Sequence, residues 1–376
     1  MTPRGGILEG VRIVEIAAIG PGPFCGMHLA DLGADVIAIE RPGLPESSSP
    51  VRRGKRSVVA DLKTADGREL VLRLIEDADA LIEGMRPGVM ERLGLGPRDC
   101  ASRNPALVYG RVTGWGQDGP LAQAPGHDNN YVALSGALYF TGTPDEPPVA
   151  PLSLLGDVAG GALYLAVGVL AGVLRARASG RGTVVDAAMV DGSAHMLHLL
   201  LGAQRKRMIT PERGGNMHDS SHFFASYRCA DGEFITLGAI EPAFYRDLLR
   251  RLGLQDEPDF QEQWDRGRWG DLRRRMAALM ATRSREEWGR LLEGTDACFA
   301  PVLSPWEAVR HPHMVARQTF FERDGELQTI PAPRFDGQAV RPGGVPRQGE
   351  HTDAVLRVLE ESPRADVWQA QRPESV

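Results

Sequence analysis

The chain has 376 residues, 42% of them hydrophobic and 24% charged, which is the composition of an ordinary globular protein with more than one domain. Its net charge of -6 disfavours a general nucleic-acid binder. The four cysteines lie far apart in the sequence, which fits a reducing cytoplasm and argues against a disulfide framework or a zinc site. The N-terminus lacks the apolar core of a signal peptide, so we expect a cytoplasmic protein.

The first part of the chain alternates between short β-branched runs and helix-like segments. The runs lie at residues 11–16, 35–40, 57–62, 80–83 and 106–113. Strands that alternate with helices predict an α/β fold with a mostly parallel, Rossmann-like sheet. Ligands of such sheets bind at the carboxyl ends of the strands.

The first turn of this pattern, residues 20–26, is rich in glycine and suggests a dinucleotide site. Its spacing is G-x-G-x-x-x-G, however, and not G-x-G-x-x-G. Pro21 and Pro23 also remove two backbone N–H donors that would hold a pyrophosphate. The sequence therefore disfavours a nicotinamide cofactor.

Basic residues gather near the predicted carboxyl ends of the strands. They are Arg41, Arg52, Arg53, Lys55, Arg56 and Lys63, followed by Arg86 and Arg92. In an acidic protein, a basic rim at this end of the sheet predicts a polyanionic small molecule such as a nucleotide phosphate. The alternative is a solvated surface loop.

The run at residues 158–174 carries no charge and contains four glycines, which predicts a helix buried in protein rather than a membrane span. Asp231-Gly232 predicts the turn of a β-hairpin. We expect a large domain at residues 1–208, a linker at 209–226 and a smaller α+β domain at 227–320. The final segment, 321–376, is expected to return to the large domain.

Three side chains are candidates for acid–base chemistry. His127 follows a glycine in a loop; it is either a loop histidine that bonds the next helix or a general base. Asp157 immediately precedes the uncharged run, as a helix N-cap or as a partly desolvated acid beside N–H groups that could hold an enolate oxygen. Glu241 is an N-cap or a carboxylate that orients His127, and Asp128 fits an N-cap best.

Motifs along nearly the whole chain resemble the family III CoA-transferase superfamily, in particular its α-methylacyl-CoA racemase branch. They lie at residues 10–15, 32–36, 40–42, 60–63, 86–88, 114–117, 126–128, 156–157 and 186–189. The resemblance implies a CoA thioester substrate, with no metal or redox cofactor. It also implies an interlocked homodimer, in which Glu241 supports His127 across the boundary between chains.

The matching motifs also imply which residues bind the substrate. Those for the nucleotide and pantetheine are Arg41, Ala60, Asp61, Leu62, Lys63, Gly84, Met85, Arg86 and Arg92, and Gly126, Asp128 and Tyr131 would line the thioester. Within the superfamily, Asp157 would exchange a proton in a racemase and act as the nucleophile in a transferase. Gly126-His127-Asp128 favours the racemase. A CoA transferase and a non-catalytic acyl-CoA-binding protein are the alternatives.

Overall fold

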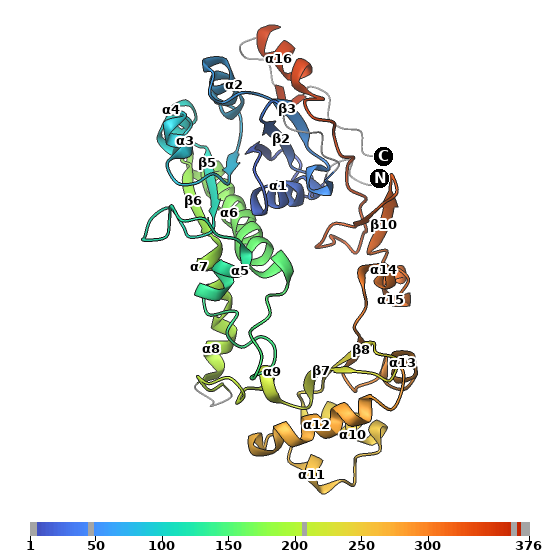
Figure 1. Ribbon diagram of the computed structural model, residues 1–376. Coiled ribbons are helices and arrows are strands. Elements are labelled where there is room, and N and C mark those ends of the chain that lie inside the picture. Colours follow the sequence, from blue (N-terminus) through green and yellow to red (C-terminus); the bar gives the residue numbers. More distant parts are fainter. Residues whose placement is uncertain (1–5, 44–48, 205–208, 362–366, 370–376) are drawn as a thin grey trace. The chain divides into compact units, whose positions relative to one another are not determined.

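The computed structural model describes residues 6–43, 49–204, 209–361 and 367–369 (Figure 1). The chain divides into two compact units. The first takes residues 1–136, 151–196 and 317–376, and the second takes residues 137–150 and 197–316. By this division the segment expected as a linker, 209–226, falls within the second unit, and the C-terminal segment, 321–376, falls within the first.

A parallel sheet forms the centre of the first unit. Within the described residues it has six strands, in the order β3-β2-β1-β4-β5-β6. The strands are β1 (Arg12–Ile16), β2 (Asp35–Glu40), β3 (Arg56–Val59), β4 (Ala80–Glu83), β5 (Val108–Thr113) and β6 (Thr183–Ala188). Valine and isoleucine dominate the strands because branched side chains pack well on a pleated surface. The predicted α/β fold with a mostly parallel sheet is confirmed.

Helices cover both faces of this sheet, and each face has its own apolar core (Figure 1). Helices α1 (Pro21–Asp31) and α6 (Leu163–Ser179) pack on one face, where Leu29 and Leu165 are fully buried. Helices α2 (Ala65–Ile75) and α16 (Thr352–Glu361) cover the other. Besides short 3-10 and π-helical segments, the described part of this unit also contains α3 (Val89–Arg92), α4 (Pro97–Arg103), α5 (Asp128–Leu134), α7 (Met189–Met196) and the hairpin of β10 (Phe320–Arg323) and β11 (Glu326–Thr329).

The uncharged run is not one regular buried helix. It begins as a π-helical segment, η3 (Leu155–Ala162), and continues as α6. One face of α6 packs on β5 and β6, but Val167 is 69% and Leu174 is 73% exposed on the opposite side. The helix predicted to be buried in protein is therefore buried on one face only within this chain. In the described part of the chain, only the stretch Leu152–Ser179 is long and apolar enough to span a bilayer, a test that core helices of soluble proteins also pass.

The second unit is an α+β structure. Strands β7 (Phe224–Arg228), β8 (Phe234–Gly238) and β9 (Phe299–Pro301) form an antiparallel sheet, and β7 and β8 are the predicted hairpin around Asp231-Gly232. Its core is aromatic, with Trp269 and Trp288 almost fully buried. The helices are α8 (His198–Gln204), α9 (Met217–Ser220), α10 (Pro242–Leu252), α11 (Pro258–Gln261), α12 (Trp269–Met280), α13 (Arg285–Leu292), α14 (Pro305–Ala308) and α15 (Pro312–Ala316).

Candidate active site

His127 and Asp157 lie on two helical elements that pack against each other in the first unit. His127 occupies the cap position of α5 and is exposed, and its backbone N–H donates to Asn130 Oδ1 at 3.0 Å. Asp157 lies in the first turn of η3 and is half-buried. Segments of η3 and α5 are in direct contact. The structure therefore brings the two predicted acid–base residues to one region of the protein, with neither sealed away from solvent.

The carboxyl group of Asp128 joins these two elements. Its Oδ2 accepts hydrogen bonds from the backbone N–H groups of Gly156 and Asp157, both at 2.7 Å. Asp128 is only 2% exposed, so these bonds form in a water-poor environment and fix η3 against α5. The N-cap interpretation of Asp128 is wrong, because Asp128 is the first residue of α5 and His127 holds the cap position.

This bonding also corrects the expected site for an enolate oxygen. The N–H groups at the start of the uncharged helix were expected to hold that oxygen. Those of Gly156 and Asp157 already donate to Asp128, so neither is available to a ligand while the Asp128 carboxylate stays in place.

Burial and charge act together on Asp157. Desolvation is the main cause that raises the pKa of its carboxyl above the ordinary value, and the nearby Asp128 charge raises it further. The charge of His127 acts in the opposite direction. A raised pKa lets a carboxyl group hold and release a proton nearer to neutral pH.

Glycines allow η3 to pack closely on its neighbours. A Cβ at Gly160 would lie 2.8 Å from Ser193 Oγ of α7, and one at Gly161 would lie 3.3 Å from Pro21 Cβ of α1. Larger residues would push η3 away from both helices. Segments of π-helix often occur at functional sites, because the wider turn redirects the side chains that it carries. Asp157 lies in the first turn of this segment.

An aromatic pair forms part of the surroundings. The rings of Trp115 and Tyr131 meet edge to face, with their centroids 4.7 Å apart. A Cβ at Gly114 would lie 2.1 Å from Tyr131 Cε1, and one at Gly126 would lie 2.7 Å from the same atom. These two glycines therefore leave just enough room for the ring. The predicted thioester residues Gly126, Asp128 and Tyr131 thus lie together near Asp157.

A cavity of about 610 Å³ lies at the carboxyl edge of the sheet, and neither Asp157 nor His127 is among the residues that line it. Gly20 lines this cavity, and a Cβ at Gly20 would lie only 3.4 Å from Asp157 Oδ2. Gly20 has a φ of +78°, a conformation that other L-residues rarely adopt. Most of the remaining wall comes from the carboxyl ends of β1, β2 and β4, from η1 (Pro50–Arg52) and its flanks, and from Pro346 and Gln348 in the C-terminal segment. The cavity is large enough for a small organic ligand.

Two of the residues predicted to bind CoA, Arg41 and Met85, line this cavity. Gly84 follows β4, and Arg86 and Arg92 lie exposed beyond it. Ala60, Asp61, Leu62 and Lys63 follow β3 at the same edge of the sheet. Their contact with a CoA ester stays a prediction.

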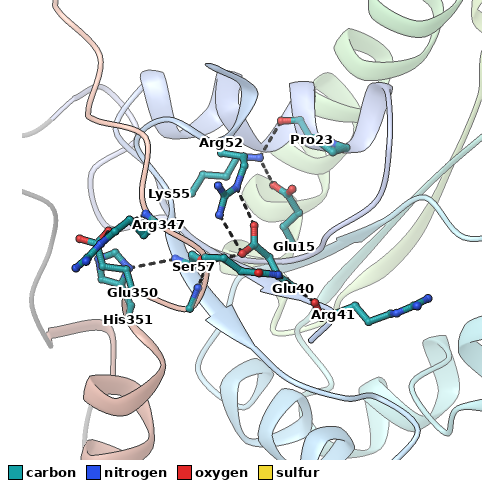
Figure 2. Close-up of polar contacts among 12 residues, drawn as sticks. Glu15, Pro23, Glu40, Arg41, Arg52, Lys55, Ser57, Arg347, Glu350 and His351 are labelled. Carbon is teal, nitrogen blue, oxygen red and sulfur yellow. Dashed lines mark hydrogen bonds and ion pairs between the residues drawn. The ribbon is translucent and has the colours of Figure 1, made fainter. Parts of the chain in front are cut away.

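Half of the basic rim is internal, which corrects both interpretations for those four residues. Arg52 pairs with Glu40, Arg53 with Asp31, Lys55 with Glu15 and Arg56 with Asp35, in contacts of 2.6–2.9 Å (Figure 2 shows the first and third). These four cations are neither a free polyanion site nor a solvated loop, because each neutralises a carboxylate in or near the sheet. Arg41, Lys63, Arg86 and Arg92 remain at the exposed surface.

Glu241 lies in the second unit, at the cap position before α10, and its side chain makes no capping hydrogen bond. Its predicted support of His127 stays a prediction. No group of three or more His, Cys, Asp or Glu side chains that could hold a metal occurs in the part of the chain that the structure describes.

The sequence interpretation missed the charged side chains inside strands. Glu15, Glu83 and Arg111 interrupt otherwise apolar strands, and all three are buried in ion pairs. A charge at an interior strand position requires a buried partner, which is a signal that the sequence contained.

The family model described as CoA-transferase family III matches residues 8–352. The alpha-methylacyl-CoA racemase of Homo sapiens is 40% identical over 353 residues, which cover 93% of this chain and 92% of the relative. The enzyme of the same name from Mus musculus is 41% identical over 358 residues, 93% of each chain. The crystal structure of a CAIB/BAIF family protein from Brucella suis matches with a TM-score of 0.79 at 25% identity, over 94% of this chain and 99% of the other.

Proposed function

Because the chain belongs to CoA-transferase family III, we propose that it inverts the α-carbon of 2-methylacyl-CoA thioesters. Two alpha-methylacyl-CoA racemases are about 40% identical to the chain over almost their whole length, and this similarity supports an enzyme of the racemase type. The acyl-CoA substrate agrees with both the family and these relatives.

The proposed reaction is a proton transfer between two faces of one carbon. His127 removes the α-proton from one face and leaves an enolate, and Asp157 returns a proton to the opposite face. In the reverse direction the two residues exchange roles. No group other than the proton is transferred, so the thioester bond stays intact throughout.

One observation carries this proposal: Asp128 fixes the element that bears Asp157 against the helix that follows His127, and Gly20, which lines the cavity, lies next to the Asp157 carboxyl. The raised pKa of Asp157 suits a residue that must both donate and accept a proton. Arg41 and Met85 in the cavity wall support a CoA ester whose nucleotide lies at this edge of the sheet.

The proposal includes a homodimer, in which Glu241 of one chain would support His127 of the other. The exposed apolar face of α6 favours such an assembly. Leu163, Val167 and Leu174 lie on one side of this helix and are 39%, 69% and 73% exposed. Size-exclusion chromatography with light scattering tests the assembly, and a monomer at micromolar concentration would refute it.

The decisive experiment is incubation of one 2-methylacyl-CoA epimer in deuterated buffer. We expect α-deuterium in both epimers and an intact thioester, and we expect the His127→Ala variant to lose exchange. Absence of α-deuterium with the wild-type chain would refute the racemase. Transfer of CoA to an acceptor acid, with an acyl-Asp157 adduct trapped by hydroxylamine, would instead identify a CoA transferase.

A further inference from the structure

Arg111 lies in β5, and its side chain contacts both ends of the segment that joins β4 to α3. Its Nε donates to Glu83 Oε1 at 2.9 Å, and Nη1 lies 2.9 Å from Glu91 Oε1. The side chain of Glu83 is fully buried, and that of Arg111 is 8% exposed. One guanidinium therefore holds two carboxylates, one at the end of β4 and one in α3. We call Glu83, Arg111 and Glu91 the Arg111 clamp.

The clamp spans the segment that contains four of the residues predicted to bind CoA. Gly84, Met85, Arg86 and Arg92 all lie between Glu83 and the end of α3. The Met85 N–H donates to Glu83 Oε2 at 2.6 Å, so the carboxylate that pairs with Arg111 also fixes the backbone of a residue in the cavity wall. The clamp is thus connected directly to the cavity.

This segment contains little structure of its own. Between Glu83 and α3 it is irregular, and Gly88 has a φ of +82°. One further bond from outside holds it, because Gln123 Nε2 donates to Pro87 O at 3.1 Å. A segment that is ordered before the ligand arrives does not lose conformational entropy on binding, so the protein binds the ligand with higher affinity.

We propose that Arg111 is a positioning residue for the substrate, which orders residues 84–92 for binding the CoA part of the thioester. The inference rests on the proposed function, since that function supplies the ligand. The clamp lies under the binding segment and contains neither His127 nor Asp157. It therefore affects binding, and the proton transfer proceeds without it.

Lysine cannot replace arginine in this role, because a single ammonium lacks the planar fork that reaches two carboxylates. Arg111→Lys keeps a cation near buried Glu83 and loses the connection to α3. Glu91→Gln removes the connection from the other side, at a side chain that is 43% exposed, and leaves the buried pair intact. These two variants weaken the clamp without leaving a buried carboxylate unpaired.

Arg56→Lys is the matched control. Arg56 binds Asp35 through Nε at 3.1 Å and Nη2 at 2.9 Å, and its side chain is 1% exposed. Both residues begin strands, so this pair lies at the amino edge of the same sheet, opposite the binding segment. The control thus makes the same chemical change in an equally buried pair far from residues 84–92.

The test is calorimetric titration with CoA, together with kcat and KM for α-deuterium exchange and a thermal melt. We expect Arg111→Lys and Glu91→Gln to raise the Kd for CoA about fivefold, equivalent to about 1 kcal/mol at about 1.4 kcal/mol per tenfold. The KM should rise with the Kd while kcat stays within about twofold. Arg56→Lys should lower the Tm and leave the Kd unchanged.

An unchanged Kd in both clamp variants, with or without a lower Tm, would overturn the inference and leave the clamp a purely structural feature. The two proposals fail separately. If the wild-type protein binds CoA but does not exchange the α-proton, the racemase proposal is refuted. The Kd values of the variants still test the role of the Arg111 clamp in that case. A wild-type chain that does not bind CoA overturns the clamp.

Discussion

Replacement of Asp128 tests the structural basis of the candidate active site. Its carboxylate accepts two N–H bonds of 2.7 Å from the element that bears Asp157. Asp128→Ala leaves both N–H groups without this acceptor, and Asp128→Asn keeps a neutral acceptor of similar shape. We expect both variants to loosen the packing of η3 on α5, the alanine more than the asparagine.

The size of the effect follows from the bonds that are lost. A hydrogen bond to a charged group contributes about 1.5–3 kcal/mol. The two bonds share one oxygen, and loss of the Asp128–Asp157 repulsion offsets part of the cost. We therefore expect Asp128→Ala to lower the free energy of unfolding by about 3 kcal/mol and Asp128→Asn by about 1 kcal/mol. A displacement of Asp157 by about 1 Å would lower kcat about 100-fold.

The asparagine variant should also change the pH dependence of activity. The Asp128 charge is the second cause, after burial, of the raised Asp157 pKa, so its removal lowers that pKa. For the epimer whose α-proton Asp157 removes, the acidic limb of kcat/KM should then move to lower pH. Urea unfolding and deuterium exchange between pH 4 and 8 measure both effects, and Asn129→Ala on the exposed next residue is the stability control. Unchanged stability and an unmoved acidic limb would refute the role of Asp128.

Three further changes have definite expected outcomes. Asp157→Asn should abolish exchange yet raise the free energy of unfolding at pH 7. The pKa of the Asp157 carboxyl is raised in the native state, so ionisation of this group makes the wild-type protein less stable as the pH rises above the ordinary carboxyl pKa. Equal urea midpoints for the two proteins at pH 7 would contradict this. Gly26→Ala would place a Cβ 1.8 Å from Glu15 Oε2 and should lower the free energy of unfolding by about 3 kcal/mol. In the same urea assay Gly289→Ala should be neutral or stabilising, because its Cβ would meet only the tip of a side chain, at 3.7 Å. Burial lowers the pKa of His222 to about 4, so the native state binds fewer protons than the unfolded chain and stability is lost as pH falls from about 6.5 to about 4. His222→Gln should remove up to about 3 kcal/mol of this loss, and an unchanged slope of stability against pH would disprove the assignment.

Short-range patterns in the sequence determined much of the fold. Runs such as residues 35–40 are branched and apolar, and helix-like segments separate them, so the parallel sheet could be predicted without knowledge of distant contacts. The hairpin around Asp231-Gly232 was predictable for the same reason, since its turn residues are adjacent. His127 and Asp157 could be identified as candidates because each follows a glycine at the start of a predicted element.

Only the tertiary structure decided how the charged groups are used. Lys55 and Glu15 are 40 residues apart, and Gly156 and Asp128 are 28 residues apart, so no local pattern could pair them. A run of arginines looks the same in a sequence whether it faces solvent or neutralises carboxylates in or near a sheet. Burial makes pairing obligatory, because an unpaired charge away from water is too costly, and burial is a property of the folded chain. The sequence therefore determined the fold and the candidate acid–base residues, and the packed structure determined which charges hold them in place.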